Sequence, residues 1–157
     1  GAADANVEKE VAVRAITPGY FSTMRVPVVN GGPLDDGHAT SSIRVAVVNQ
    51  AFVDRFLSSS NPIDQRLRFL RAEWRIVGVV GNERFHGVTN PAAPAAYVSL
   101  NHAPWPMLAL VVRTLSGDPV AVTPGLRRAV GEIDPALAMF GDEPLRETLT
   151  NPFAQHR

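Results

Sequence analysis

The residues of this chain that could carry chemistry are few and lie far apart in the sequence. Its histidines fall in separate turn or terminal segments: His38, His86, His102 and His156. No two of them are four residues apart, the spacing that places two imidazoles on one helix face around a zinc ion. Cysteine is absent, which excludes thiol catalysis, disulfides and zinc-thiolate sites. We therefore expect no metal site and no cofactor.

The remaining candidates for catalysis favour structural roles. Gly78, Gly81 and Gly87 fit neither the G-x-G-x-x-G nor the G-x-x-x-x-G-K-[ST] phosphate-binding pattern. Asp35 and Asp36 precede a glycine in a polar stretch, which is typical of solvated turns. The sequence predicts no catalytic residue, and we expect the chain not to be an enzyme.

Several arginines gather around one predicted hairpin: Arg66, Arg68, Arg71 and Arg75. Guanidinium groups placed close together bind carboxylates and phosphates. Asp64 and Glu73 lie in the same stretch, however, and offer ordinary ion pairs. Two interpretations remain open, a stand-alone domain that senses a small molecule or anion and a surface of paired charges.

Composition excludes further classes of function. The 157-residue chain has a formal net charge of zero, and its basic residues are arginines apart from Lys9. Because nucleic-acid binding needs a basic patch or stripe, we expect no nucleic-acid partner. No apolar run approaches the ~20 residues that a membrane-spanning helix requires.

The elements that must position these residues can be predicted from hydrophobic periodicity. Residues 7–16 alternate as a strand, and Thr17 and Pro18 then begin a short helix over 19–24. A buried strand over 45–48 leads through the helix cap Asn49 into an amphipathic helix. Residues 66–70 and 74–80 form a predicted hairpin, in which Gly78 and Gly81 indicate the close approach of neighbouring groups.

The rest of the chain contains a polar stretch and a β-α-β pattern. Residues 35–43 have the composition of an exposed loop or linker. Strands are expected over 108–113 and 138–140, with a helix between them that presents Leu126, Val130 and Ile133 on one face. Another helix is expected from Asp142 onward.

Four segments, taken together and in order, resemble a known family. They are 13–27, 45–56 with 61–67, 74–100, and 110–114 with the following Gly-Asp-Pro and Ile-Asp-Pro. This set is similar to the extracytoplasmic core domain of MacB-type, FtsX-like ABC transporter permeases, most closely the permeases abundant in acidobacteria. Where relatives commonly have glycine, this chain has Asp64, a residue type that tolerates a left-handed turn.

The resemblance implies an α+β fold with two small mixed α/β subdomains. A porter-like β-α-β subdomain would be formed by both chain ends, residues 1–42 and 104–157, with a second α/β subdomain inserted at 43–103. It also implies a non-catalytic periplasmic domain of an inner-membrane permease, which relays ATP-driven motion to export or extrusion.

The implied partners are the transmembrane part of the same permease, a cytoplasmic ATPase reached through it, and a second permease copy or a periplasmic adaptor. Because turns and connectors carry recognition more often than packed strands do, we expect contact at a small set of residues. They are Tyr20, Phe21, Arg84, His86, Pro91 and Pro94. Packing and turn formation are the alternative roles for each of them.

Overall fold

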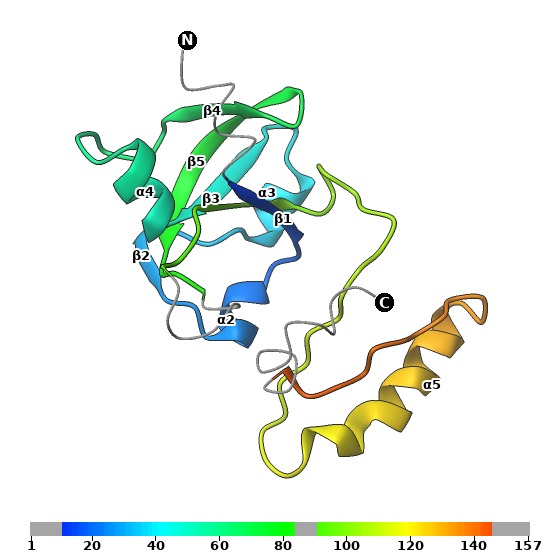
Figure 1. The fold of residues 1–157 in the computed structure, drawn as a ribbon. Coiled ribbons are helices and arrows are strands. Elements are labelled where there is room, and N and C mark those ends of the chain that lie inside the picture. The colour runs from blue at the N-terminus through cyan, green and yellow to red at the C-terminus, as the bar shows by residue number, and fades with distance from the viewer. Residues whose placement is uncertain (1–10, 84–90, 146–157) are drawn as a thin grey trace. The chain divides into compact units, whose positions relative to one another are not determined.

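The computed structural model describes residues 11–83 and 91–145, which belong to two compact units (Figure 1). The first unit comprises residues 1–83 with 91–111, and the second comprises 84–90 with 112–157. Each unit is described by itself.

The first unit is built on a six-stranded mixed sheet. Its strands are β1 (Ala12–Ile16), β2 (Val28–Gly31), β3 (Val45–Asn49), β4 (Arg66–Phe69), β5 (Ala72–Val80) and β6 (Ala95–Ser99). Their order is β1-β6-β3-β5-β2, and β4 also pairs with β5. The β1–β6 and β3–β5 pairs are parallel, and the other pairs are antiparallel. The predicted α+β class is confirmed.

The sheet is covered on both faces, which explains the continuous apolar run of β3. Ala46 and Val48 belong to one core cluster, together with Phe52 of helix α4 (Gln50–Phe56). Val45 and Val47 belong to the opposite cluster, together with Phe21 of helix α2 (Tyr20–Met24). A strand buried on both faces has no polar face to alternate with its apolar one.

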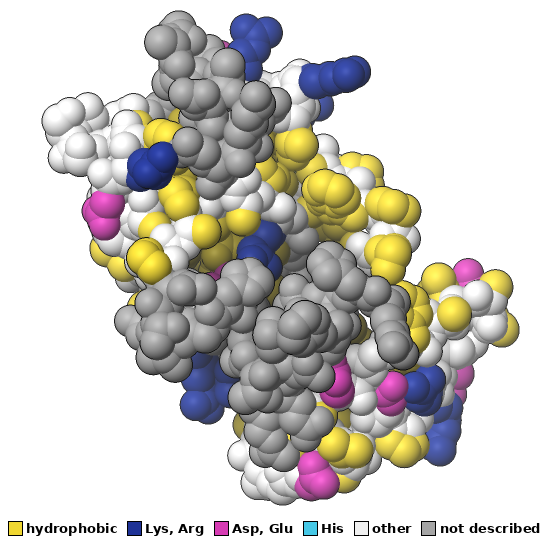
Figure 2. Space-filling model, viewed as in Figure 1, with side chains coloured by type: hydrophobic (Ala, Val, Ile, Leu, Met, Phe, Trp, Pro, Cys, Tyr) yellow, Lys and Arg dark blue, Asp and Glu magenta, His cyan; other side chains and the backbone are white. Residues whose placement is uncertain are grey.

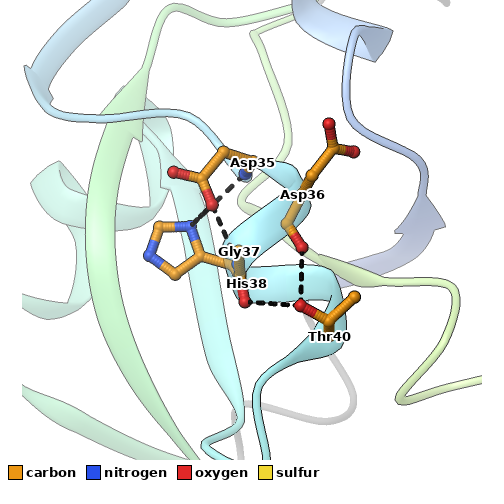
Figure 3. A network of polar contacts seen from close by, with 5 residues as sticks. All are labelled: Asp35, Asp36, Gly37, His38 and Thr40. Atoms are coloured by element: carbon orange, nitrogen blue, oxygen red, sulfur yellow. Dashed lines mark hydrogen bonds and ion pairs between the residues drawn. The ribbon is translucent and has the colours of Figure 1, made fainter.

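The predicted loop over 35–43 is only partly correct, because helix α3 (Asp36–Thr40) lies within it. Asp35 begins this helix by accepting a hydrogen bond from the backbone N–H of His38 at 2.8 Å. His38 Nδ1 in turn accepts from the Asp35 backbone N–H at 3.3 Å, which completes a reciprocal cap (Figure 3). Aspartate is a strong capping residue, so the polar composition that predicted a loop also suits a helix start.

Glycines let β2 lie directly against β5, as the sequence predicts for Gly78. A Cβ atom on Gly78 would overlap the carbonyl oxygen of Gly32. Gly81 lies against the Pro27 ring, where a Cβ atom would be 3.1 Å from Cγ. The expected close approach at both glycines is confirmed.

Two turns of this unit use left-handed residues that are not glycine. Asp64 has φ 66°, in agreement with the expectation that aspartate preserves the turn. Leu70 and Arg71, with φ 49° and 56°, form the two-residue connection between β4 and β5. A hairpin turn with two positive φ angles usually contains asparagine and glycine, so leucine and arginine are held there at a conformational cost.

The second unit contains a 3₁₀ turn (Pro119–Val122) and helix α5 (Thr123–Ile133) among its described residues. Arg127 of α5 donates to Asp142 Oδ1 at 2.7 Å. No described residue of 112–145 is buried. The strands expected over 108–113 and 138–140 are wrong for the described residues, since neither segment enters a ladder there.

Hydrophobic side chains gather over the segment that follows β6 (Figure 2). Among them Trp105 is 48% exposed and Met107 is 69% exposed.

The strands of the predicted parts 1–42 and 43–103 share one sheet. The three-part division at 42 and 103 stays a prediction.

Candidate partner-contact site

The candidate site lies in the first unit, where three segments far apart in the sequence meet around one carboxylate. Glu83 follows β5, Tyr20 begins α2 and Tyr97 lies in the middle of β6. The Tyr20 hydroxyl donates to Glu83 Oε1 at 2.8 Å, and the Tyr97 hydroxyl donates to Oε2 at 2.6 Å. We call these three residues the tyrosine clamp.

Burial and the nearby Glu83 carboxylate both favour the protonated form of the two clamp tyrosines. Tyr97 has no solvent exposure and Tyr20 is half-buried. Burial is the largest cause that raises the pKa of both hydroxyls above the ordinary value, and the hydrogen bond to the Glu83 carboxylate raises it further. Arg14 acts in the opposite direction on both pKa values without overcoming these effects.

Aromatic packing holds the clamp in place. The Phe21 ring meets the Tyr97 ring edge-on, with centroids 4.8 Å apart, and Tyr20 meets Phe21 in the same way at 5.6 Å. Edge-to-face pairs at these separations are favourable beyond the area they bury. The clamp therefore fastens α2 to the sheet by two kinds of contact.

Asn49 forms a second junction, at the end of β3. Its Oδ1 accepts from the N–H of Phe52, which caps α4 as predicted, and also from the N–H of Ala95 at 2.9 Å. Its Nδ2 donates to the carbonyl of Ala93 at 2.9 Å. A side chain that is 2% exposed thus joins α4 to the connector that leads into β6.

The structure brings several of the predicted contact residues to this region. Phe21 is 5% exposed, which argues against direct contact with a partner, whereas Tyr20 is half-buried. Pro91 is exposed, and the Pro94 carbonyl accepts from Ala12 N–H at 2.9 Å. Arg84 and His86 lie outside the described residues. Partner contact at these positions stays a prediction.

The polar groups around Asp35 and Asp36 are arranged for structure. No group of three or more histidine, aspartate or glutamate side chains that could hold a metal occurs in the described ranges. Asp35 is occupied as a helix cap, and Thr40 donates to the Asp36 carbonyl at 3.1 Å (Figure 3).

The arginine hairpin consists in part of paired charges. Arg66 forms an ion pair with Glu73 at 2.6 Å, and Arg75 lies 3.9 Å from Asp64. The geometry therefore gives no specific support to an anion site centred on Arg66, Arg68 and Arg75.

Sequence reasoning missed Glu83 and Tyr97. Periodicity places Tyr97 in a strand and Glu83 in a turn, but it does not show that both meet Tyr20. One signal was available: an acidic residue three positions after the apolar end of β5, in a chain with only two tyrosines.

Comparisons with known proteins agree with this architecture. Residues 2–128 match the family model of the MacB-like periplasmic core domain. No curated protein matches the sequence. Among the described residues, no helix is long and apolar enough to cross a membrane.

Two solved structures are similar in fold. The periplasmic region of MacB from Actinobacillus actinomycetemcomitans superposes with a TM-score of 0.60 at 14% identity, over 77% of this chain and 56% of that one. The extracellular domain of the noncanonic ABC-type transporter YknZ from Gram-positive bacteria superposes with a TM-score of 0.58 at 16% identity, over 78% and 64% respectively. This chain thus spans less than two thirds of either.

Proposed function

The chain belongs to the family of MacB-like periplasmic core domains of ABC transporter permeases, and on this premise we propose that it relays ATP-driven motion of the membrane part to export or extrusion of a substrate. The family match over residues 2–128 carries the proposal. The domain lies on the periplasmic side of the membrane, and we assign no reaction to it.

The tyrosine clamp supports a mechanical role. Within one unit of a relay, the segments must move as a body, so that displacement at one segment reaches the others. The clamp joins α2, the end of β5 and β6 through one carboxylate, and Asn49 joins α4 to the start of β6. Through the clamp, a displacement of α2 would be passed to the sheet.

The proposed partners are those of a permease. The transmembrane part would deliver the motion, a cytoplasmic ATPase would generate it, and a second permease copy or a periplasmic adaptor would receive it. Tyr20 and Pro91 are the contact residues we propose first, because Tyr20 is only half-buried and Pro91 is exposed. The porter-like subdomain made from residues 1–42 and 104–157 belongs to the same proposal.

The relay can be tested in the full permease with its ATPase in proteoliposomes. This chain has no cysteine, so Ser22→Cys on α2 and Arg128→Cys on α5 introduce two defined, exposed attachment points. Reducible cross-linkers of increasing reach would then tie the two units to each other. We expect ATP hydrolysis to fall several-fold with the shortest linker that reacts, and to recover on reduction.

The two single-cysteine variants, treated in the same way, control for modification alone. Mass spectrometry measures the extent of cross-linking. Unchanged ATP hydrolysis in fully cross-linked permease would show that movement between the units is not part of the cycle.

A further inference from the structure

A cleft of about 310 Å³ lies in the first unit, between the β4–β5 turn and residues 102–105. This volume is at the lower end of the range found for small-molecule sites. Tyr20, Glu83 and Tyr97 do not line it, so the cleft is separate from the tyrosine clamp.

Both tryptophans of the chain line this cleft. Trp74 is 1% exposed, stacks on Phe69 with centroids 5.3 Å apart, and donates from Nε1 to the Phe69 carbonyl at 2.9 Å. Trp105 is 48% exposed, and Leu70 of the strained turn is 41% exposed. The cleft thus combines a fixed indole with two apolar side chains that still offer surface to a ligand.

Two positively charged side chains line the cleft. Arg44 and Arg71 line it, both are exposed, and neither forms an ion pair in the described part of the chain. Arg66 on the same hairpin has Glu73 at 2.6 Å. No carboxylate is among the lining residues, so an anion would meet two guanidinium groups without competition.

His102 adds a ring nitrogen, Nδ1, that has no hydrogen-bond partner in the described part of the chain. Its Nε2 lies 2.7 Å from the Ser41 carbonyl oxygen, which can only accept, so Nε2 donates in this contact. In the neutral imidazole, Nδ1 then has a lone pair. Nδ1 is buried and has no hydrogen-bond partner among the described residues. A buried acceptor in this state calls for a donor N–H or O–H.

From these features we propose that the cleft binds a small apolar carboxylate with an adjacent amide N–H, the chemistry of an N-acyl amino acid with a large apolar side chain. Arg44 and Arg71 bind the carboxylate, and the apolar side chain packs on Leu70 and Trp105. Because His102 Nδ1 is buried, its ring must turn toward the cleft to accept from the ligand N–H. Positive φ angles at Leu70 and Arg71 hold both side chains at the cleft, and strained backbone of this kind is characteristic of binding sites. This site is independent of the relay.

The test uses tryptophan fluorescence of the full chain, because both of its tryptophans line the cleft. N-acetyl-L-phenylalanine is the probe, and N-acetyl-L-phenylalaninamide and acetate are the controls for charge and for apolar contact. We expect a saturable change with the first probe only. An acetylated peptide ending in phenylalanine distinguishes the two sources of this chemistry: tighter binding assigns a peptide carboxyl terminus, and weaker binding assigns the free N-acyl amino acid.

Two double variants with equal loss of charge localise the binding. Arg44→Gln with Arg71→Gln should raise the Kd at least tenfold, whereas Arg68→Gln with Arg128→Gln, neither of which lines the cleft, should leave it unchanged. Circular dichroism confirms that both variants are folded. The proposal is overturned if the probe gives no saturable change up to about 10 mM, if the amide binds equally well, or if both double variants bind alike.

Discussion

Alkaline pH should destabilise this domain in a way that reports on the tyrosine clamp alone. Tyr20 and Tyr97 are the only tyrosines of the chain, and both donate to Glu83. In the unfolded chain each would lose its proton near the ordinary pKa of 10.0. In the folded state both pKa values are raised, mainly by burial, so the protons are retained.

The magnitude follows from proton linkage. Above pH 10, folding requires the uptake of a proton by Tyr97. The contribution of Tyr97 to the free energy of unfolding is therefore fully present below pH 10 and declines above it. The unfolding free energy falls by about 1.4 kcal/mol per pH unit for this one group. At a pH of about 11.5 the loss is about 2 kcal/mol, a large part of the 5–15 kcal/mol typical of a domain. Tyr20 adds less to this loss of unfolding free energy, because water reaches its hydroxyl and screens its charge.

Two measurements check this reasoning. Tyrosinate absorbance of the folded chain should stay low at pH values where the urea-unfolded chain is already ionised. Urea unfolding as a function of pH should give the slope, which Tyr97→Phe should reduce by about 1.4 kcal/mol per pH unit. A folded chain whose tyrosines both titrate with a midpoint near 10 would refute the clamp as described.

Three substitutions test other parts of the fold, the first two by urea unfolding and the third by thermal unfolding. Asn49→Ala removes a helix cap and two hydrogen bonds to the β6 connector, so we expect a loss of about 3 kcal/mol, and a loss below about 1 kcal/mol would contradict that role. Gly78→Ala places a Cβ atom against the Gly32 carbonyl, and we expect a loss of about 3 kcal/mol; wild-type stability would show that β2 is not held against β5 there. Gly131→Ala, in open space on α5, should stabilise that helix by about 0.5–1 kcal/mol, measured as a higher helix melting temperature; a decrease would mean that the glycine is covered in solution.

Local chemistry decides which elements the sequence can predict. β3 and α4 are predictable because an apolar run, a capping asparagine and a helical repeat all agree over 45–57. β2 is not, because its four residues are all exposed and it becomes a strand only by pairing with β5. Residues 108–113 show the opposite case, in which strand propensity is present but the segment does not form a strand. The tyrosine clamp depends on contacts between residues up to 77 positions apart, from Tyr20 to Tyr97, which periodicity does not encode.

The distribution of polar partners separates the relay from the cleft. Within the sheet, Asn49 and the clamp hydroxyls form hydrogen bonds to other segments of the fold, and these bonds hold the segments together. At the hairpin, Arg44, Arg71 and His102 Nδ1 keep bonding capacity that the described fold does not use. The two roles should therefore respond to different variants. We expect Glu83→Gln to weaken the clamp and leave ligand binding unchanged. Arg71→Gln should weaken ligand binding and leave the loss of stability at alkaline pH unchanged.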